Sequence, residues 1–229
     1  MAGAVLIVGG SSGLGREIAS HYAGKGAAVI ITSRDEARAE TVAAEIGGNC
    51  QGIALDLNDV NGIGLALAGV GSVKHLVIAA IERDENRIRD YSIERALKLV
   101  NLKLVGYPAV IHSLLDRLES DGSIVLFGGL AKDRPYPGSL TVTSVNGGVA
   151  TMINSLAIDL APIRVNAIHP GIVGDSPYWQ DKNLDGVKAR TPGGNLVTME
   201  DVVGAVVFLL ENGGVSGLNL YIEQGIRAT

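Results

Sequence analysis

The sequence predicts a doubly wound α/β fold, in which one parallel sheet of seven strands is covered by helices on both faces. Apolar runs such as AVLIV, AVII and IVLF lack alternating polar residues, which is typical of strands buried on both faces. Stretches with helical spacing lie between these runs, and strands that alternate with helices form parallel sheets. The 229 residues, 47% of them hydrophobic, suit one core, so we expect a single domain over residues 1–229.

The first third of the chain alternates regularly. A β-branched run at 4–8 ends in glycines, and helical spacing follows, with Ile18, Ala19 and Tyr22 on one side. The pattern continues to residue 80. We expect strands at 4–8, 27–32, 52–55 and 75–80, and helices at 14–23, 35–46 and, with a weaker pattern, 60–68.

The rest of the chain contains longer helices. Two of them each lead into an apolar strand, and a last helix and strand complete the sheet. Residues 172–200 are the exception, with prolines, glycines and few periodic hydrophobics. Because long irregular stretches in compact domains are usually functional, we expect a substrate loop there. The expected helices are 92–118, 140–160 and 202–210, and the expected strands are 123–127, 163–169 and 218–222.

Composition and charge exclude several classes of protein. Nineteen basic and 24 acidic side chains give a net charge of −5, and only 4% of residues are aromatic, so a nucleic-acid partner is not indicated. The longest apolar run, 202–210, is too short to cross a bilayer as a helix. The lone Cys50 cannot form an intrachain disulfide, and MAGAVLIVGG lacks the basic start of a secretory signal. We expect a cytoplasmic protein with no membrane segment and no metal site.

A glycine-rich loop, VGGSSGLG at 8–15, connects the first strand to the first helix. Glycines there permit a tight turn and a close approach of the backbone to a ligand. The exposed amides at the start of the helix would then hold a pyrophosphate. Glycines also serve ordinary turns, but this position favours a Rossmann-type dinucleotide-binding domain.

The chain resembles the short-chain dehydrogenase/reductase family over nearly its whole length. The family's Gly-x-x-x-Gly-x-Gly pattern is matched by Gly9, Gly13 and Gly15, and RVNAIHPG (164–171) and the glycine-ending YIEQG also match. Asp56-Leu57 follows the third strand, where the family binds adenine, and Asn101 lies in LVNL. The cofactor-binding residues that the resemblance implies are Gly9, Ser11, Ser12, Gly13, Leu14, Gly15, Ser33, Arg34, Asp56, Leu57, Ala79, Ala80, Asn101, Pro170, Gly171 and Ile172.

The end of the second strand favours NADP(H) over NAD(H). A strand that binds NAD usually ends in an acidic residue that bonds the ribose 2′-hydroxyl, whereas a basic group suits a 2′-phosphate. Here Ser33 is followed by Arg34, whose guanidinium can clamp a phosphate. In the alternative, Arg34 is a solvated residue at the start of a helix, and Asp35 caps that helix and serves NAD.

The family's usual catalytic residues are replaced. Members usually carry a Ser and a YxxxK pair on one helix, where the Lys lowers the pKa of the proton-donating Tyr. In the matching register, the Ser position is Gly129, the Tyr position is Val142 and the Lys position is Asn146. Asn101 alone remains of the catalytic set. The usual mechanism therefore cannot be transferred to this chain.

Three functions remain open. In the favoured one, the protein reduces a carbonyl with NADPH and takes the proton from an unusual donor, because hydride chemistry belongs to the cofactor. The second is a nucleotide-bound sensor or partner subunit without catalysis. The third is a different reaction, such as isomerisation, with a structural dinucleotide. The candidate catalytic residues are Asn101, Asn146, Ser139 and His169; Thr143 could also offer a hydroxyl.

The region from 135 to 158 suggests self-association, because it contains no charged side chain and its helix lacks a polar face. One side can cover the sheet and the other needs a partner, so we expect a homodimer or homotetramer. In the alternative, residues 172–200 cover that side within the monomer. An apolar set around Gly129 and Val142 suggests a hydrophobic carbonyl substrate, a cyclic or aromatic ketone. Its loop members would be Ile172, Val173, Pro177, Tyr178 and Trp179.

Overall fold

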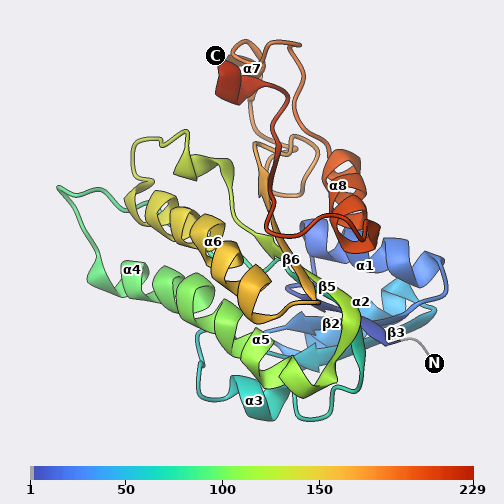
Figure 1. The fold of residues 1–229 in the computed structure, drawn as a ribbon. Helices are drawn as coiled ribbons and strands as arrows, with labels where there is room; N and C mark the ends of the chain where they lie inside the picture. Colours follow the sequence, from blue (N-terminus) through green and yellow to red (C-terminus); the bar gives the residue numbers. More distant parts are fainter. Residues whose placement is uncertain (1–2) are drawn as a thin grey trace.

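The computed structural model describes residues 3–229 and contains one seven-stranded sheet in the order β3-β2-β1-β4-β5-β6-β7 (Figure 1). Every pair of neighbouring strands is parallel. The predicted doubly wound fold is therefore confirmed. The strands are β1 (Ala4–Val8), β2 (Ala28–Ser33), β3 (Asn49–Ala54), β4 (Val73–Ile78), β5 (Leu118–Phe127), β6 (Arg164–Pro170) and β7 (Asn219–Ile222).

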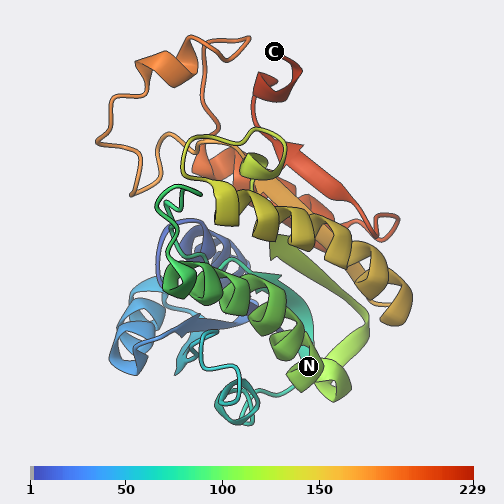
Figure 2. The same cartoon turned by 90° about the vertical axis from the view of Figure 1, so that its left-hand side faces the viewer.

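Helices cover both faces of the sheet, and each face has its own core (Figures 1 and 2). Strand side chains alternate between the two cores: Leu76 and Ile78 of β4 pack on one face and Val77 on the other. Helices α3, α5 and α6 pack on the first face, where α4 contacts α6, and α1, α2 and α8 pack on the second. The α-helices are α1 (Gly13–Gly24), α2 (Glu36–Ile46), α3 (Ile63–Ala66), α4 (Ile93–Val100), α5 (Tyr107–Leu114), α6 (Leu140–Asp159), α7 (Asp185–Lys188) and α8 (Met199–Glu211).

The helix predicted at 92–118 is interrupted. After α4 the chain forms a π-helical turn, η1 (Asn101–Gly106), before α5 continues and a 3₁₀ turn, η2 (Leu115–Arg117), ends the segment. Pro108 contributes to the change, since it has no N–H for the carbonyl four residues earlier. Wider π turns of this kind are frequent at functional sites.

Other predicted boundaries also shift. The weak helix at 60–68 is reduced to the single turn α3, because Gly62 and Gly64 disfavour a longer helix. Strand β5 begins at Leu118, five residues before the predicted start, although LESDG carries three polar residues. The loop at 172–200 contains the short α7 and lies beside the C-terminal turn (Figures 1 and 2). Thr229 Oγ1 donates to the Arg190 carbonyl between these two segments.

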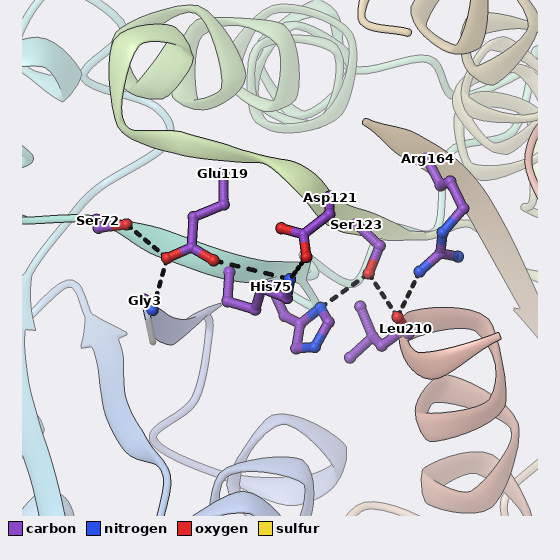
Figure 3. A network of polar contacts seen from close by, with 9 residues as sticks. Gly3, Ser72, His75, Glu119, Asp121, Ser123, Arg164 and Leu210 are labelled. Atoms are coloured by element: carbon purple, nitrogen blue, oxygen red, sulfur yellow. Dashed lines mark hydrogen bonds and ion pairs between the residues drawn. The ribbon is translucent and has the colours of Figure 1, made fainter. Parts of the chain in front are cut away.

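A polar network ties the amino-terminal edge of the sheet to α8 (Figure 3). Ser123 Oγ donates to the Leu210 carbonyl at 2.9 Å, so the His75 Nδ1–H donates to Ser123 Oγ, also at 2.9 Å. Lys74 forms ion pairs with Glu119 and Asp121 nearby. Burial, together with the charges of Lys74 and Arg164, lowers the pKa of His75 to about 4. The imidazole is therefore neutral at physiological pH.

Lowering the pH from about 6.5 to 4 should reduce the free energy of unfolding through His75, by about 1–2 kcal/mol after a discount for the ring's solvent contact. The unfolded ring takes up a proton near pH 6.5, whereas the folded ring resists it down to about 4. The unfolded state then binds more protons, and stability is lost as the pH falls. Denaturant titrations at several pH values should show a shallower acid loss for His75→Gln. His112→Gln, which removes an exposed histidine from α5, is the control; equal slopes in all three proteins would contradict the prediction.

Candidate active site

The glycine loop closes tightly against its neighbours at the carboxyl-terminal edge of the sheet. Gly9 has φ +84°, and a Cβ added there would lie 2.8 Å from Ala80 backbone atoms. A Cβ at Gly15 would lie 2.2 Å from the Gly9 carbonyl oxygen. The buried Thr32 fixes the loop from β2, since its Oγ1 accepts from Gly9 N at 3.2 Å and its carbonyl accepts from Gly10 N. Only glycine fits at positions 9 and 15 without a shift of the backbone.

The N-terminus of α1 keeps its amides available for a ligand. Helices α2, α4 and α8 are capped by the side chains of Asp35, Ser92 and Thr198. In α1, by contrast, the N-cap residue Ser12 makes no side-chain cap hydrogen bond to the described chain, and no acidic residue lies in the first turn. Free N–H groups and the helix dipole together attract an anion. Gly13, with φ +51°, has no atom within 4 Å of an added Cβ, so the approach is open.

At the end of β2, the basic side chain of Arg34 is largely exposed and the carboxylate of Asp35 caps a helix. Asp35 Oδ1 accepts from Arg38 N at 2.7 Å, which commits this carboxylate to capping α2. The Arg34 side chain is 67% exposed and forms a long ion pair of 3.6 Å with Glu82. Ser33 Oγ accepts from Asp35 N, so its hydroxyl hydrogen is free to donate. An exposed guanidinium and a hydroxyl that can donate therefore lie together at the end of β2.

The other residues expected around the cofactor follow the ends of β3, β4 and β6. The exposed Asp56 accepts from Asn58 N, and the neighbouring Leu57 is buried. Ala80 is held by Tyr107 of α5, whose hydroxyl donates to the Ala80 carbonyl at 2.8 Å. After β6, Gly171 N donates to the Ile222 carbonyl, which leaves Pro170 and Ile172 beside the last strand. Together with the glycine loop, these residues can hold a dinucleotide along one edge of the sheet.

The three replaced catalytic positions carry one polar side chain, the amide of Asn146. Gly129 follows β5, and an added Cβ there would lie 2.8 Å from Asn146 Nδ2 of α6. Asn146 is 4% exposed, and Val142, one turn earlier, is partly buried. The side chain at the family's lysine position therefore faces the family's serine position. The oxygen of a substrate carbonyl beside Gly129 would therefore meet the Asn146 amide N–H, in place of the Ser and Tyr hydroxyls that family members usually carry.

A residue that the sequence patterns did not single out completes this group. Lys103 of η1 is 4% exposed, and its Nζ lies 2.8 Å from Asn146 Oδ1, 2.9 Å from the Phe127 carbonyl and 3.3 Å from the Gly128 carbonyl. Burial lowers the pKa of Lys103 to about 7. The available signal was a single lysine within the apolar stretch LVNLKLVG. A buried ammonium thus touches the side chain at the family's lysine position, although it comes from another helix.

His169 is completely buried and both of its ring nitrogens are bonded. Asn219 Nδ2 donates to the Ala150 carbonyl, so Asn219 Oδ1 faces His169 Nε2, which carries the proton and donates at 2.7 Å. Nδ1 then accepts from Gly129 N at 3.1 Å. Burial lowers the pKa of His169 to about 4. This geometry favours a role in fixing the Gly129 loop over one in proton transfer at neutral pH.

Ser139 and Asn101 differ in burial: Ser139 is buried, whereas Asn101 is half-buried. Ser139 is buried at the start of α6, where its Oγ accepts from Tyr136 N and bonds Thr143 Oγ1. Thr143 in turn donates to the Ala131 carbonyl. Both hydroxyls are therefore engaged in closing the turn. Asn101 is half-buried at the first residue of η1, two positions before Lys103.

The loop at 172–200 folds towards the segment after β4. The guanidinium carbon of Arg83 lies 3.1 Å from the centre of the Tyr178 ring, and Lys182 Nζ lies 3.2 Å from it. Asp175 Oδ1 accepts from Met199 N and fastens the loop to α8. Trp179 is half-buried and packs edge-on against Tyr178. These contacts place the rings of Tyr178 and Trp179 beside Arg83, in the segment that follows β4.

Within residues 3–229, no group of three His, Cys, Asp or Glu side chains is arranged to hold a metal ion. The same residues contain no helix long and apolar enough to cross a membrane.

Comparisons with known proteins agree with this geometry. Residues 8–227 match a family model described as enoyl-(acyl carrier protein) reductase. A 3-oxoacyl-(acyl-carrier-protein) reductase from Bos taurus is 30% identical over 232 residues, which cover 97% of each chain. Carbonyl reductase (NADPH) 2 from Sus scrofa is 29% identical and covers 98% of this chain and 96% of its own.

A solved structure is similar over the same extent. The 3-ketoacyl-(acyl-carrier-protein) reductase from Brucella melitensis, complexed with NADH, has a TM-score of 0.86 at 27% identity, with 99% of each chain covered. The sheet order and the glycine loop described above thus occur in a chain whose sequence matches reductases from end to end. This chain belongs to the short-chain dehydrogenase/reductase family.

Proposed function

We propose that this short-chain reductase uses NADP(H) to reduce the carbonyl of a small hydrophobic substrate, without the family's usual proton donor. The observation that carries the proposal is the combination of the open α1 N-terminus with the exposed Arg34. The glycine loop packs tightly at Gly9 and Gly15, and at Gly13 an added Cβ would meet no neighbouring atom within 4 Å, so a pyrophosphate can approach the start of α1 there. Arg34 is available to the 2′-phosphate, while Asp35 is engaged as a helix cap. One relative carries NADPH in its name and one similar structure holds NADH, so the choice between them rests on Arg34.

The chain's own residues would bind and orient the reactants. When bound, the reduced dinucleotide supplies a hydride to the carbonyl carbon; the carbonyl becomes an alcohol, the nicotinamide is oxidised and solvent water supplies the proton. The substrate carbonyl is proposed to lie beside Gly129 and Asn146, where Asn146 Nδ2 offers its oxygen a hydrogen bond. His169 holds the loop that carries Gly129. Asn101 is proposed to face the same space from η1.

The substrate is proposed to be apolar around its carbonyl. Val142 and the loop residues Ile172, Pro177, Tyr178 and Trp179 are the hydrophobic side chains proposed to contact it. Two relatives are named for acting on 3-oxoacyl groups carried by acyl carrier protein. A 3-oxoacyl thioester and a cyclic or aromatic ketone are therefore the first substrates to test.

Calorimetric titration of the protein with NADPH and NADH tests the cofactor part of the proposal. We expect NADPH to bind at least about tenfold more tightly, because a 2′-phosphate gains a charge-assisted contact with Arg34. Equal affinities, or tighter binding of NADH, would contradict the assignment. A sensor that binds NADPH would pass this test, so turnover must be measured separately. The sensor is the less favoured function, since the matching relatives are named as reductases.

The protein is expected to form a homodimer or homotetramer. Figure 2 shows α4 and α5 end to end in one green rod, which lies beside the yellow α6 on one face of the molecule. This face exposes Ile93, Leu97, Val105 and Leu140, and the loop at 172–200 leaves Leu140 43% exposed. Sedimentation equilibrium at micromolar concentration should show an oligomer, and the double variant Leu97→Glu/Val105→Glu should weaken it at least tenfold. Phe208→Glu, on α8 across the sheet, is the control; a monomeric wild type would contradict the prediction.

A further inference from the structure

The side chain of Lys103 is an ammonium enclosed by polar groups of the protein, with no acidic partner among them. Its three N–H groups face the Phe127 carbonyl, the Gly128 carbonyl and Asn146 Oδ1, at 2.9, 3.3 and 2.8 Å. Burying an ammonium costs several kcal/mol unless its donors are satisfied. A hydrophobic residue would fill this position at lower cost. The retained charge therefore suggests a use beyond packing.

The ammonium determines which way the Asn146 amide faces. A protonated lysine can only donate, so the atom of Asn146 that contacts the ammonium must be the carbonyl oxygen, Oδ1. Nδ2 consequently lies on the other side, where it is the nearest atom to a Cβ added at Gly129, at 2.8 Å. Among the hydrogen bonds of the described residues, none uses Nδ2 as a donor. An oriented N–H thus remains available beside Gly129.

The positive charge of Lys103, next to Asn146 Oδ1, makes the Asn146 Nδ2–H group a stronger hydrogen-bond donor. Hydrogen bonds in a chain polarise one another, most strongly where water is excluded. The oxygen of a carbonyl gains negative charge as its carbon is reduced, and preorganised donors aimed at that oxygen lower the barrier. We propose that Lys103 is a positioning residue, which orients and polarises the Asn146 amide so that Nδ2 donates to the oxygen of the substrate carbonyl. This inference rests on the proposed function, since it assigns roles in carbonyl reduction.

Other titratable groups near Lys103 do not change protonation in the neutral range. On α5, the Tyr107 ring centre lies 6.0 Å from Nζ, and burial raises the pKa of that phenol. On β6, His169 has a pKa of about 4. Helix α6 carries no charge before Asp159, and Lys132, beyond Gly129, pairs with Asp133. A transition near pH 7 can therefore be assigned to Lys103, whose pKa burial lowers to about 7.

The test compares Lys103→Met, Asn146→Asp and, as control, Lys25→Met, which removes an exposed lysine at the end of α1. In wild type, kcat should fall as the pH rises through about 7 and the ammonium is lost. Lys103→Met should lower kcat about 10- to 100-fold and abolish this transition, with the Kd for NADPH within about twofold of wild type. Asn146→Asp keeps an acceptor for Lys103 and should fold, but it lacks the N–H and should lower kcat about 100-fold. Lys25→Met should behave as wild type.

A second readout does not depend on turnover. In protein labelled with ¹⁵N, the Lys103 Nζ signal and the Asn146 side-chain amide signal should titrate with one midpoint, and the Asn146 signal should stop titrating in Lys103→Met. An Asn146 signal that does not follow Lys103, or an unchanged kcat and pH profile in Lys103→Met, would overturn the positioning role while leaving the proposed function intact. A wild type that reduces no carbonyl would instead overturn the proposed function, and the catalytic part of this inference with it.

Discussion

Gly15→Ala is expected to raise the Kd for NADPH at least about 100-fold, because the new methyl group would disrupt the pyrophosphate site. Its Cβ would lie 2.2 Å from the Gly9 carbonyl oxygen, 2.9 Å from the Gly9 carbonyl carbon and 3.1 Å from Gly10 Cα. All three are backbone atoms of the loop itself, so the loop must move away from α1. The same strain should lower the free energy of unfolding by about 1–3 kcal/mol. Calorimetry and denaturant titration measure the two effects.

Gly24→Ala provides the matched control on the same helix. A Cβ at Gly24 has no atom within 4 Å, apart from its own helix and chain neighbours. This variant should bind NADPH within twofold of wild type and gain up to about 0.5–1 kcal/mol of stability, since alanine favours the helix. If Gly15→Ala bound NADPH as tightly as Gly24→Ala does, the glycine loop would not be the pyrophosphate site.

Arg34→Ala should weaken NADPH binding about 10- to 100-fold and leave NADH binding unchanged, since only NADPH carries the 2′-phosphate that this guanidinium would contact. The wild-type side chain is 67% exposed and forms one long ion pair among the described residues, at 3.6 Å from Glu82, so it can turn towards a ligand. The loss corresponds to about 1.5–3 kcal/mol, the usual value for hydrogen bonds to charged groups. Parallel calorimetric titrations with the two nucleotides measure it.

Two further variants test whether a loss of NADPH affinity in Arg34→Ala is specific to this residue. Arg87→Ala removes another exposed arginine, one paired with Glu85, and should leave both affinities unchanged. Asp35→Asn tests the alternative in which this carboxylate serves NAD; it should affect neither nucleotide by more than about twofold, since an asparagine can still cap α2. A specific loss of NADH affinity in Asp35→Asn, with none in Arg34→Ala, would reverse the cofactor assignment.

The sheet was predictable because its signals are local. Runs such as AVLIV and IVLF became β1 and the end of β5, and the glycines after β1 became the turn into α1. The interruption of the long helix at η1 was not predictable from periodicity. The apolar spacing continues through 101–106, and the π turn depends on Pro108 and on packing against α6.

The candidate active site was predictable only in part, because some of its contacts join residues that are far apart in the sequence. The residues at Gly129, Val142 and Asn146 follow from the register of one matching segment. Lys103 is different, because its acceptors lie 24, 25 and 43 positions away along the chain. In sequence, a lysine between leucines resembles a solvated residue on an amphipathic helix. Only the fold shows that Lys103 is buried against Asn146. Likewise, only the fold shows that His169 is buried and that each of its ring nitrogens forms a hydrogen bond.

The most direct test of the account is hydride transfer itself. Purified protein would be mixed with NADPH carrying deuterium at both hydrogen positions of the nicotinamide C4, together with a 3-oxoacyl thioester, a cyclic ketone or an aromatic ketone. We predict consumption of NADPH and an alcohol product labelled at the former carbonyl carbon, with at least one of these substrates. Tight binding of NADPH without any labelled alcohol from the three substrates would contradict the account and favour a nucleotide-binding sensor or partner subunit.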